Sequence, residues 1–251
     1  MLSPQELIRY DRQILIEGLG AAGQAKLKKT RVVVAGTGGL GSPISIYLTA
    51  AGVGMIRLID YDVVDLDNLN RQVLYGSENI GQPKVEAARC RLQALNPEVA
   101  IEAVNERITE SNAAGLVDGF DIIVDGLDNL PMRYLLNKAA VEKKIPFVHG
   151  AVSGFEGRVM TVLPGKSACL MCLLRGVTVQ GKIPIIGVTP AVIGAIEATE
   201  VVKYITGLGE LLTDRLLVYD GLAMQFSELK VKRNPECPHC GTSAQSLKIK
   251  S

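Results

Sequence analysis

Four glycines follow a short apolar run in "RVVVAGTGGLGSP", residues 31–43. Gly36, Gly38 and Gly41 give the spacing G-x-G-x-x-G, which is typical of a loop that leads from a strand into a helix and holds a phosphate against backbone amides. Gly39 lies within the same loop. The pattern predicts a nucleotide site. The alternative is a tight turn in which the glycines only permit close packing of the helix.

Acidic and amide side chains gather after the next apolar run, in "MIRLIDYDVVDLDNLNRQ". Asp60 ends this run at the distance from the glycines at which an acid reaches the hydroxyls of a nucleotide ribose. The polar residues that follow are Asp62, Asp65, Asp67, Asn68, Arg71 and Gln72. A solvated loop can have the same composition, so this cluster indicates a site only together with its neighbours.

Cations distinguish ATP from a redox dinucleotide. Lys84 follows Pro83 in "GQPKVEAAR", where proline predicts the first turn of a helix. The helix dipole places partial positive charge at this end, so a lysine there is unfavourable unless an anion lies between its ammonium and the helix amides. The alternative is a flexible surface lysine. Triphosphate chemistry needs several cations and usually Mg²⁺, and Arg71 and Lys84 could supply two of them. The sequence therefore favours ATP over NAD.

Two further acids stand at the end of the apolar run "DIIVDG", residues 121–126, and just beyond it in "DGLDNLPMR". Asp125 and Asp128 are expected at the carboxyl end of a parallel strand, where open sheets bind their ligands. A Mg²⁺ role is favoured for this pair. Capping of the next helix is the alternative.

Four of the five cysteines form two Cys-x-x-Cys pairs, Cys169 with Cys172 and Cys237 with Cys240. In a reducing compartment such pairs indicate a metal before a disulfide. Four thiolates suit a closed tetrahedral Zn²⁺ site with a structural role. Unmetallated thiols and ligation by His239 are the alternatives.

The elements that must position these residues alternate between strand and helix. Helices are expected over 3–29, with a break near 18–23, and near 41–51, 83–95, 110–118, 130–143 and 190–206. Strands are expected at 31–36, 55–60, 99–104, 121–126 and 146–150. They predict an α/β fold with a Rossmann-like, mostly parallel sheet and helices on both faces. The strand-like runs "GRVMTVLP", "LLVYDG" and "FSELKVKR" predict an antiparallel C-terminal region carrying the four-cysteine zinc site, with 164–189 irregular.

Length and composition indicate one domain of 251 residues. We expect N-terminal helices at 1–29, a nucleotide-binding part at 30–150 and a carrier-binding and zinc part at 151–251. The net charge of +1 gives no reason to expect nucleic acid or a membrane surface as a partner. The N-terminus lacks the features of a signal peptide and no apolar run is long enough to span a membrane, so a cytoplasmic protein is expected.

These motifs, in this order, together resemble the HesA/MoeB/ThiF family of ubiquitin-activating-like adenylyltransferases. The resemblance runs from "RYDRQ" through the glycine loop, "DNLNRQ" and "GQPKVEAAR" to "DGLDNLPMRYLLN" and both cysteine pairs. It covers nearly the whole chain. An NAD-dependent oxidoreductase and a non-catalytic zinc-ribbon binding protein remain the alternatives.

The resemblance implies adenylation, by ATP, of the C-terminal glycine of a small ubiquitin-fold sulfur carrier ending in Gly-Gly, on a homodimer. It implies that Asp60 holds the ribose and that Asp128 positions Mg²⁺. The phosphate contacts that it implies are Asn68, Arg71, Gln72 and Lys84. It also implies that Arg12 reaches the neighbouring protomer's site.

A covalent step on this enzyme is not expected. The segment 173–188 contains no cysteine, and four of the five thiols are assigned to the metal. Cys90 remains, in the expected helix "KVEAARCRLQAL", where a small buried apolar role is predicted. We therefore expect the reaction to stop at the acyl-adenylate, with sulfur arriving from a separate donor.

Overall fold

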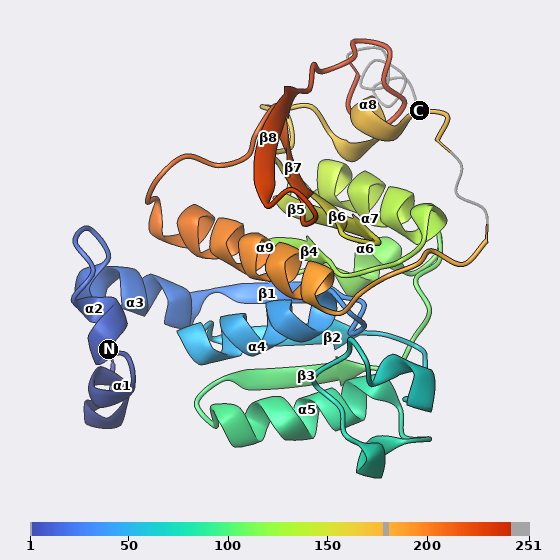
Figure 1. Cartoon of the computed structure of the whole chain (residues 1–251). Helices are drawn as coiled ribbons and strands as arrows, with labels where there is room; N and C mark the ends of the chain where they lie inside the picture. The colour runs from blue at the N-terminus through green and yellow to red at the C-terminus, as the bar shows by residue number, and fades with distance from the viewer. Residues whose placement is uncertain (1, 178–180, 242–251) are drawn as a thin grey trace.

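A computed structural model describes residues 2–177 and 181–241 of the chain (Figure 1). Its strands form one sheet in the order β3-β2-β1-β4-β5-β6-β7-β8. The strands are β1 (Arg31–Ala35), β2 (Met55–Ile59), β3 (Ala100–Val104), β4 (Ile122–Asp125), β5 (Phe147–Ser153), β6 (Glu156–Val162), β7 (Arg215–Asp220) and β8 (Gln225–Lys230).

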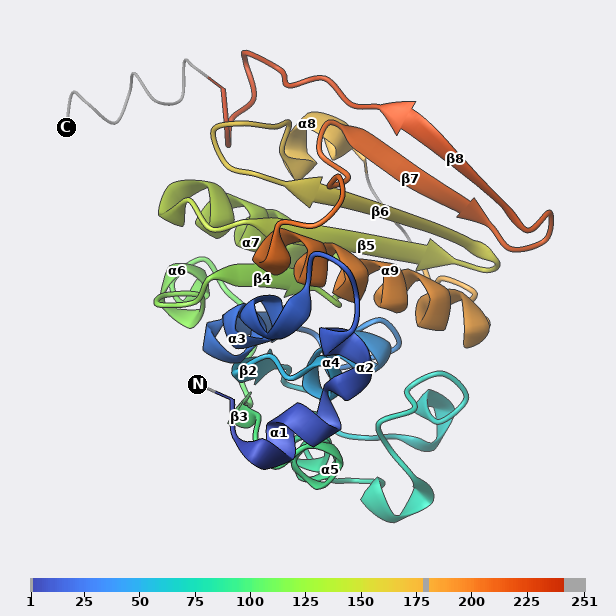
Figure 2. The same ribbon diagram turned by 90° about the vertical axis from the view of Figure 1, so that its left-hand side faces the viewer.

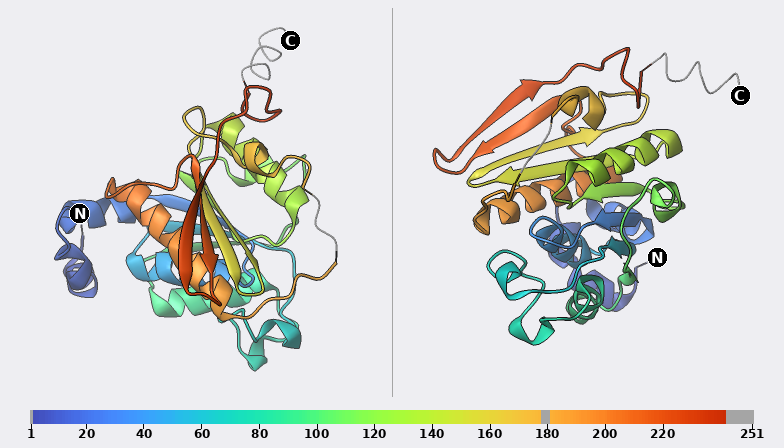
Figure 3. Two further views of the ribbon diagram at one scale, coloured as in Figure 1. Left: turned by 45° about the horizontal axis from the view of Figure 1, so that its top comes forward. Right: turned by 90° about the vertical axis from the view of Figure 1, so that its right-hand side faces the viewer.

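Strands β3, β2, β1, β4 and β5 are parallel, and β5 to β8 are antiparallel. Figures 2 and 3 show β6, β7 and β8 extending the sheet beyond its parallel part. The described helices are α1 (Pro4–Arg9), α2 (Asp11–Ile14), α3 (Gly20–Lys29), α4 (Gly41–Ala51), α5 (Lys84–Leu95), α6 (Ala113–Leu116), α7 (Leu130–Lys143), α8 (Leu170–Leu174) and α9 (Val188–Thr206), with short 3-10 turns η1 (Leu66–Asn68) and η2 (Ser77–Asn79). The expected fold class is confirmed.

Both faces of the parallel sheet are covered. Successive residues of β1 point to opposite faces, so Val32 joins one apolar core and Val33 joins the other. The first core includes side chains of α3, α4, α5 and α9, and the second those of α6, α7 and α8. Each fully buried valine contributes about 1.5–3 kcal/mol of transfer free energy, which explains why these strands are continuous apolar runs.

Most expected elements are confirmed, with four local differences. The helical segment expected over 3–29 with a break near 18–23 is interrupted at residue 10 and over 15–19 instead. Residues 164–189 were expected to be irregular, but 170–174 form α8, a short helix that begins at the first cysteine pair. Strand β5 extends to residue 153 because it continues into a hairpin with β6. Helix α6 covers only 113–116 of the expected 110–118.

The N-terminal segment begins as its sequence predicts. Ser3 caps α1 by accepting a hydrogen bond from Glu6 N, and the Glu6 side chain accepts from Ser3 N, with Pro4 at the first helical position. Figure 1 shows α1 and α2 at the left edge of the molecule, away from the right-hand side toward which β3 points. Among the residues that the structure describes, no helix combines the length and the apolar character needed to cross a membrane.

Candidate active site

A cavity of about 820 Å³ opens at the carboxyl ends of the parallel strands. It lies where the strand order reverses between β1 and β4, since Gly36 follows β1 and Gly126 follows β4 and both line it. Open α/β sheets bind their ligands at such a position. Most of the predicted site residues line it: Gly36, Gly38, Gly39, Asp60, Asp62, Arg71, Gln72, Lys84 and Asp128.

The glycines of the loop have two different roles. Gly36 has a φ of 85°, and a Cβ there would lie 2.6 Å from the carbonyl oxygen of Gly126. A Cβ on Gly41 would lie 1.9 Å from the Gly36 oxygen, and Gly41 does not line the cavity. These two positions therefore serve the close approach of backbone segments. Gly38 and Gly39 form the cavity wall and leave it open for a ligand.

Asp60 fixes the geometry of the same loop. Thr37 donates from its backbone N and from Oγ1 to Asp60 Oδ2, at 2.8 and 3.0 Å, and Asp62 N donates to Oδ1 at 3.0 Å. A carboxylate can accept about four hydrogen bonds, so one acceptor position remains. The side chain is 9% exposed at the cavity wall, where it can accept from a hydroxyl of a ligand.

Cations and an unpaired amide oxygen face the cavity from the following segment. The Lys84 ammonium lies 3.1 Å from Asp62 Oδ2, and Lys84 is 5% exposed. Arg71 Nη1 donates to the backbone oxygen of Asp67. Gln72 Oε1 is buried without a hydrogen-bond partner in the described residues. A buried polar atom without a partner costs about 1–3 kcal/mol, which fits a position that a ligand donor completes.

Asn68 has a local structural role here. It closes the capping box of η1, accepting from Asp65 N at 3.2 Å and donating to Asp67 Oδ1 at 2.5 Å. Its side chain is not part of the cavity wall. Of the two amide side chains predicted for the site, Gln72 lines the cavity, whereas Asn68 stabilises the loop beside it.

The two acids after β4 also differ. Asp128 is exposed at the cavity wall, just before Asn129, whose Oδ1 accepts from Met132 N and caps α7. Asp125 is fully buried and turned away from the cavity: Leu127 N donates to Oδ1, and His149 Nδ1 lies 2.6 Å from Oδ2. The Mg²⁺ role considered for Asp125 is therefore wrong, because its oxygens are used inside the protein.

The four paired cysteines come together away from the cavity. Their Sγ atoms all lie within 4.8 Å of one another, with Cys169 to Cys237 at 3.6 Å and Cys172 to Cys240 at 3.4 Å. Tetrahedral Zn–S bonds of about 2.3 Å would place sulfurs about 3.8 Å apart. The donor set and its spacing therefore fit a closed four-coordinate metal site.

Residues 10–239 match the ThiF family. The chain belongs to this family. It is 44% identical to the sulfur carrier protein adenylyltransferase of Thermus thermophilus, over 94% of this chain and 92% of that protein. It is 42% identical to the SAMP-activating enzyme E1 of Haloferax volcanii, over 96% and 91%. It is 40% identical to the molybdopterin-synthase adenylyltransferase of Escherichia coli, over 96% and 98%.

Solved structures agree with this assignment. The chain is similar to Escherichia coli MccB in complex with ATP, with a TM-score of 0.84 and 26% identity, over 92% of this chain and 74% of that one. It is equally similar to MccB with MccA-N7isoASN, with a TM-score of 0.85 and 26% identity over 93% and 75%. The predicted resemblance to the ThiF family is thus confirmed.

Two residues considered in the sequence lie outside the cavity of this ThiF-family fold. Arg12 is exposed on α2 and does not line the cavity of its own chain. Cys90 was predicted to be buried, and this is wrong: it is exposed on α5. The inward face of that helix carries Val85, Ala88 and Leu92, and Cys90 lies about 200° around the helix from Ala88, on the outer face.

The sequence did not reveal a buried polar cluster beneath the cavity. Arg133 of α7 donates from Nη2 to the backbone oxygens of Leu127 and Gly150, and its Nε lies 3.2 Å from Asp125 Oδ2. Burial lowers the pKa of His149. Arg133 thus ties the loop before Asp128 to β5. A signal that could have found it is the position of Arg133 shortly after the strand-end Asp125 and near the start of α7.

Glu197 of α9 belongs to the same cluster. Both carboxyl oxygens are buried without a hydrogen-bond partner among the described residues, and a Cβ on Gly150 would lie 2.3 Å from Oε2. Burial, reinforced by the negative charge of Asp125, raises its pKa well above the ordinary value. Burial therefore favours the protonated, neutral form of the Glu197 side chain.

Proposed function

We propose that this protein uses ATP to adenylate the C-terminal glycine of a small ubiquitin-fold sulfur carrier that ends in Gly-Gly. One carboxylate oxygen of the carrier attacks the α-phosphorus, the bond from this phosphorus to the bridging oxygen breaks, and pyrophosphate leaves. A carboxylate is already ionised at neutral pH, so no general base is needed. Catalysis then depends on positioning and charge neutralisation.

The observation that carries this proposal is that Lys84 and Arg71 line the same cavity as Gly38 and Gly39. Two cations beside a phosphate-binding loop suit a triphosphate, whereas the pyrophosphate of a dinucleotide needs fewer. The family relatives, which are named adenylyltransferases and an activating enzyme, support the same reaction.

In this proposal Asp60 accepts from the ribose hydroxyls, and Asp128 positions Mg²⁺, whose charge offsets that of the phosphates. The phosphates are contacted by Arg71, Gln72 and Lys84, with Asn68 holding their loop in place or reaching them when ATP is bound. Arg12 is supplied by the second protomer of a homodimer, since its exposed position on α2 leaves it free to enter a neighbour's cavity.

The metal held by Cys169, Cys172, Cys237 and Cys240 is proposed to be Zn²⁺. All four positions are thiolates, which leaves none open for chemistry, so the ion stabilises the fold. The carrier is proposed to bind the 151–251 part, within a single adenylation domain. Sulfur comes from a separate donor. We place the enzyme in the cytoplasm because paired thiols suit a reducing compartment.

The test is ATP–pyrophosphate exchange with purified protein, Mg²⁺ and candidate carriers ending in Gly-Gly. Exchange is expected only when such a carrier is present, and removal of its last glycine should abolish it. No exchange with any candidate carrier, together with tight binding of NADH, would instead support an oxidoreductase. Zinc binding without either activity would support a non-catalytic binding protein.

A further inference from the structure

We propose that the four-cysteine site and the nucleotide cavity are energetically coupled through Tyr134, so that the metal positions one wall of the cavity. This rests on the proposed function in one respect only: ATP is taken as the ligand of the cavity. The contacts that join the two sites come from helices α7 and α8.

Helix α7 touches the cavity with one end and the cysteine site with its middle. Residues 130–134 all line the cavity. Asn137 is fully buried one turn beyond Tyr134 on the same face of the helix. Its Oδ1 accepts from Leu170 N, the first residue of α8, and its Nδ2 lies 2.6 Å from His239 Nδ1. His239 stands between Cys237 and Cys240 in the chain.

Tyr134 makes the connection from the cavity side. Its hydroxyl donates to the backbone oxygen of Leu174 at 2.7 Å, at the end of α8. Its ring meets the ring of His239 edge-on, with the centroids 6.5 Å apart. A single side chain at the cavity wall thus contacts both metal-bearing segments, α8 with Cys172 and the loop with His239.

Helix α8 also leads directly into the cavity wall. It is only five residues long, and a helix of that length has little stability of its own. Cys172 N donates to Cys169 O, so the metal ligands and the helix share one turn. Val177, three residues after α8, lines the cavity. A metal bound by these thiolates would therefore fix α8, the position of Tyr134 and the start of this wall together.

Coupling between two sites is reciprocal: a ligand that binds more tightly when the metal is present must also hold the metal more tightly. The test is therefore the zinc affinity of the native protein, measured at equilibrium by competition with a colorimetric chelator. We expect saturating Mg²⁺ and a non-hydrolysable ATP analogue to raise this affinity about fivefold or more. We expect Tyr134→Phe, which removes the hydroxyl but keeps the ring, to abolish most of this increase.

Tyr204→Phe is the matched control. Tyr204 lies on α9 and lines neither the cavity nor the cysteine site, so this variant should behave like the wild-type protein. Calorimetry on zinc-loaded protein shows whether the analogue binds. Binding without any change in zinc affinity would overturn the coupling and leave the proposed function intact, as would an equal increase in Tyr134→Phe and wild type. Absence of binding would overturn both.

Discussion

The ammonium of Lys84 is enclosed by the protein while its acidic partner is half exposed. Lys84 retains 7% of its side-chain surface and Asp62 retains 50%. A buried cation with one partially solvated partner is poorly balanced, and a phosphate oxygen of a bound ligand can complete its donor set. An ion pair with only a structural role would not require the ammonium of Lys84 to be buried at the cavity wall.

Replacing Lys84 with alanine should slow pyrophosphate exchange severely, because a cation is lost from a site dense in phosphate. The expected loss is about 2–4 kcal/mol of transition-state stabilisation, by analogy with the deletion of one oxyanion donor. Arg71→Ala should behave alike. The control is Lys138→Ala, which removes a half-exposed lysine paired with Glu110 on the surface. Near-normal exchange in both cavity variants would contradict the assignment.

Glu197 should leave a signature in the pH dependence of stability. Its folded pKa is raised above 4.5 by burial, so the folded state binds more protons than the unfolded state as soon as the pH exceeds 4.5. The free energy of unfolding therefore falls as pH rises from that value toward the folded pKa. Glu197→Gln keeps the shape and cannot ionise. Urea titrations between about pH 5 and about pH 8 should show a weaker decline in this variant than in wild type, and an identical decline would refute the raised pKa of Glu197.

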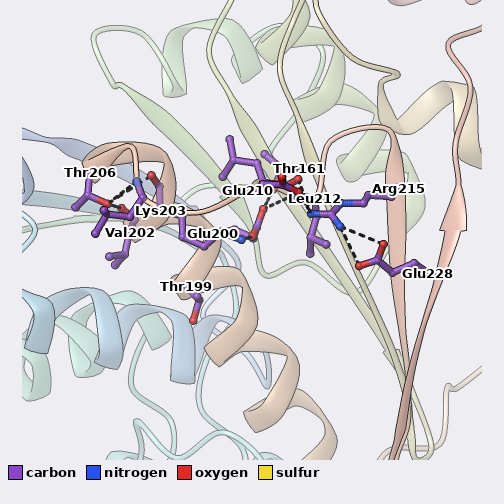
Figure 4. A network of polar contacts seen from close by, with 12 residues as sticks. Thr161, Thr199, Glu200, Val202, Lys203, Thr206, Glu210, Leu212, Arg215 and Glu228 are labelled. Atoms are coloured by element: carbon purple, nitrogen blue, oxygen red, sulfur yellow. Dashed lines mark hydrogen bonds and ion pairs between the residues drawn. The ribbon is translucent and has the colours of Figure 1, made fainter. Parts of the chain in front are cut away.

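At the scale of elements, α9 is joined to the antiparallel strands by a buried carboxylate (Figure 4). Glu200 Oε2 accepts from Thr161 Oγ1 of β6 at 2.6 Å and from Leu212 N at 2.7 Å, and Lys203 Nζ donates to Oε1. The carboxylate thus fixes the helix, the strand and the turn that follows the helix relative to one another. This network holds the long helix that packs over the first core.

Glu200→Ala is expected to lower the free energy of unfolding by about 3–5 kcal/mol, because it leaves Lys203, Thr161 and Leu212 N without their partner. Glu228→Ala is the matched comparison: it breaks the ion pair with Arg215, half exposed on β8, and should cost about 1 kcal/mol or less. Urea denaturation measures both. Similar losses in the two variants would contradict the proposed difference between the buried and the exposed pair.

Elements with long, regular apolar patterns were predictable from the sequence, and those fixed by tertiary contacts were not. The pattern predicted α4 and α7 with their observed bounds. It missed α8, a five-residue helix whose Cys172 contacts Cys240 from far along the chain. It placed the glycine loop, Asp60 and Lys84 at one cavity because strand ends meet there. It could not separate Asp128 from Asp125, since the burial of Asp125 depends on Arg133 and His149 from other elements.

At the scale of the whole molecule, the N-terminal segment has features of an interface. Exposed apolar side chains on and after α1 and α2 are Leu7, Ile8, Leu15 and Ile16. Arg12 lies among them in sequence, on α2, and Figure 1 shows α2 on the side of the fold away from the right-hand side toward which β3 points. Exposed apolar patches of this kind suit contact with another protein surface. A symmetric pair would present each Arg12 to the other protomer.

Mixing variants can decide whether Arg12 acts across such a dimer. Arg12→Ala and Lys84→Ala should each be nearly inactive in pyrophosphate exchange. In their heterodimer one cavity has Lys84 from its own chain and Arg12 from its partner, while the other has neither. Random pairing at equal concentrations makes half of the dimers mixed, so about a quarter of the wild-type activity should return.

The double variant Arg12→Ala/Lys84→Ala supplies the opposite experiment. If Arg12 acts across the interface, a heterodimer of this chain with wild type has no complete cavity, because the wild-type cavity lacks its partner's arginine. The double variant should then suppress wild-type activity on mixing. If Arg12 acts within its own chain, the wild-type cavity stays complete in every pair and the first mixture recovers nothing. Native mass spectrometry must show that mixed dimers form; with them present, an unsuppressed wild-type rate and no recovery would together overturn the assignment of Arg12 to the neighbouring site.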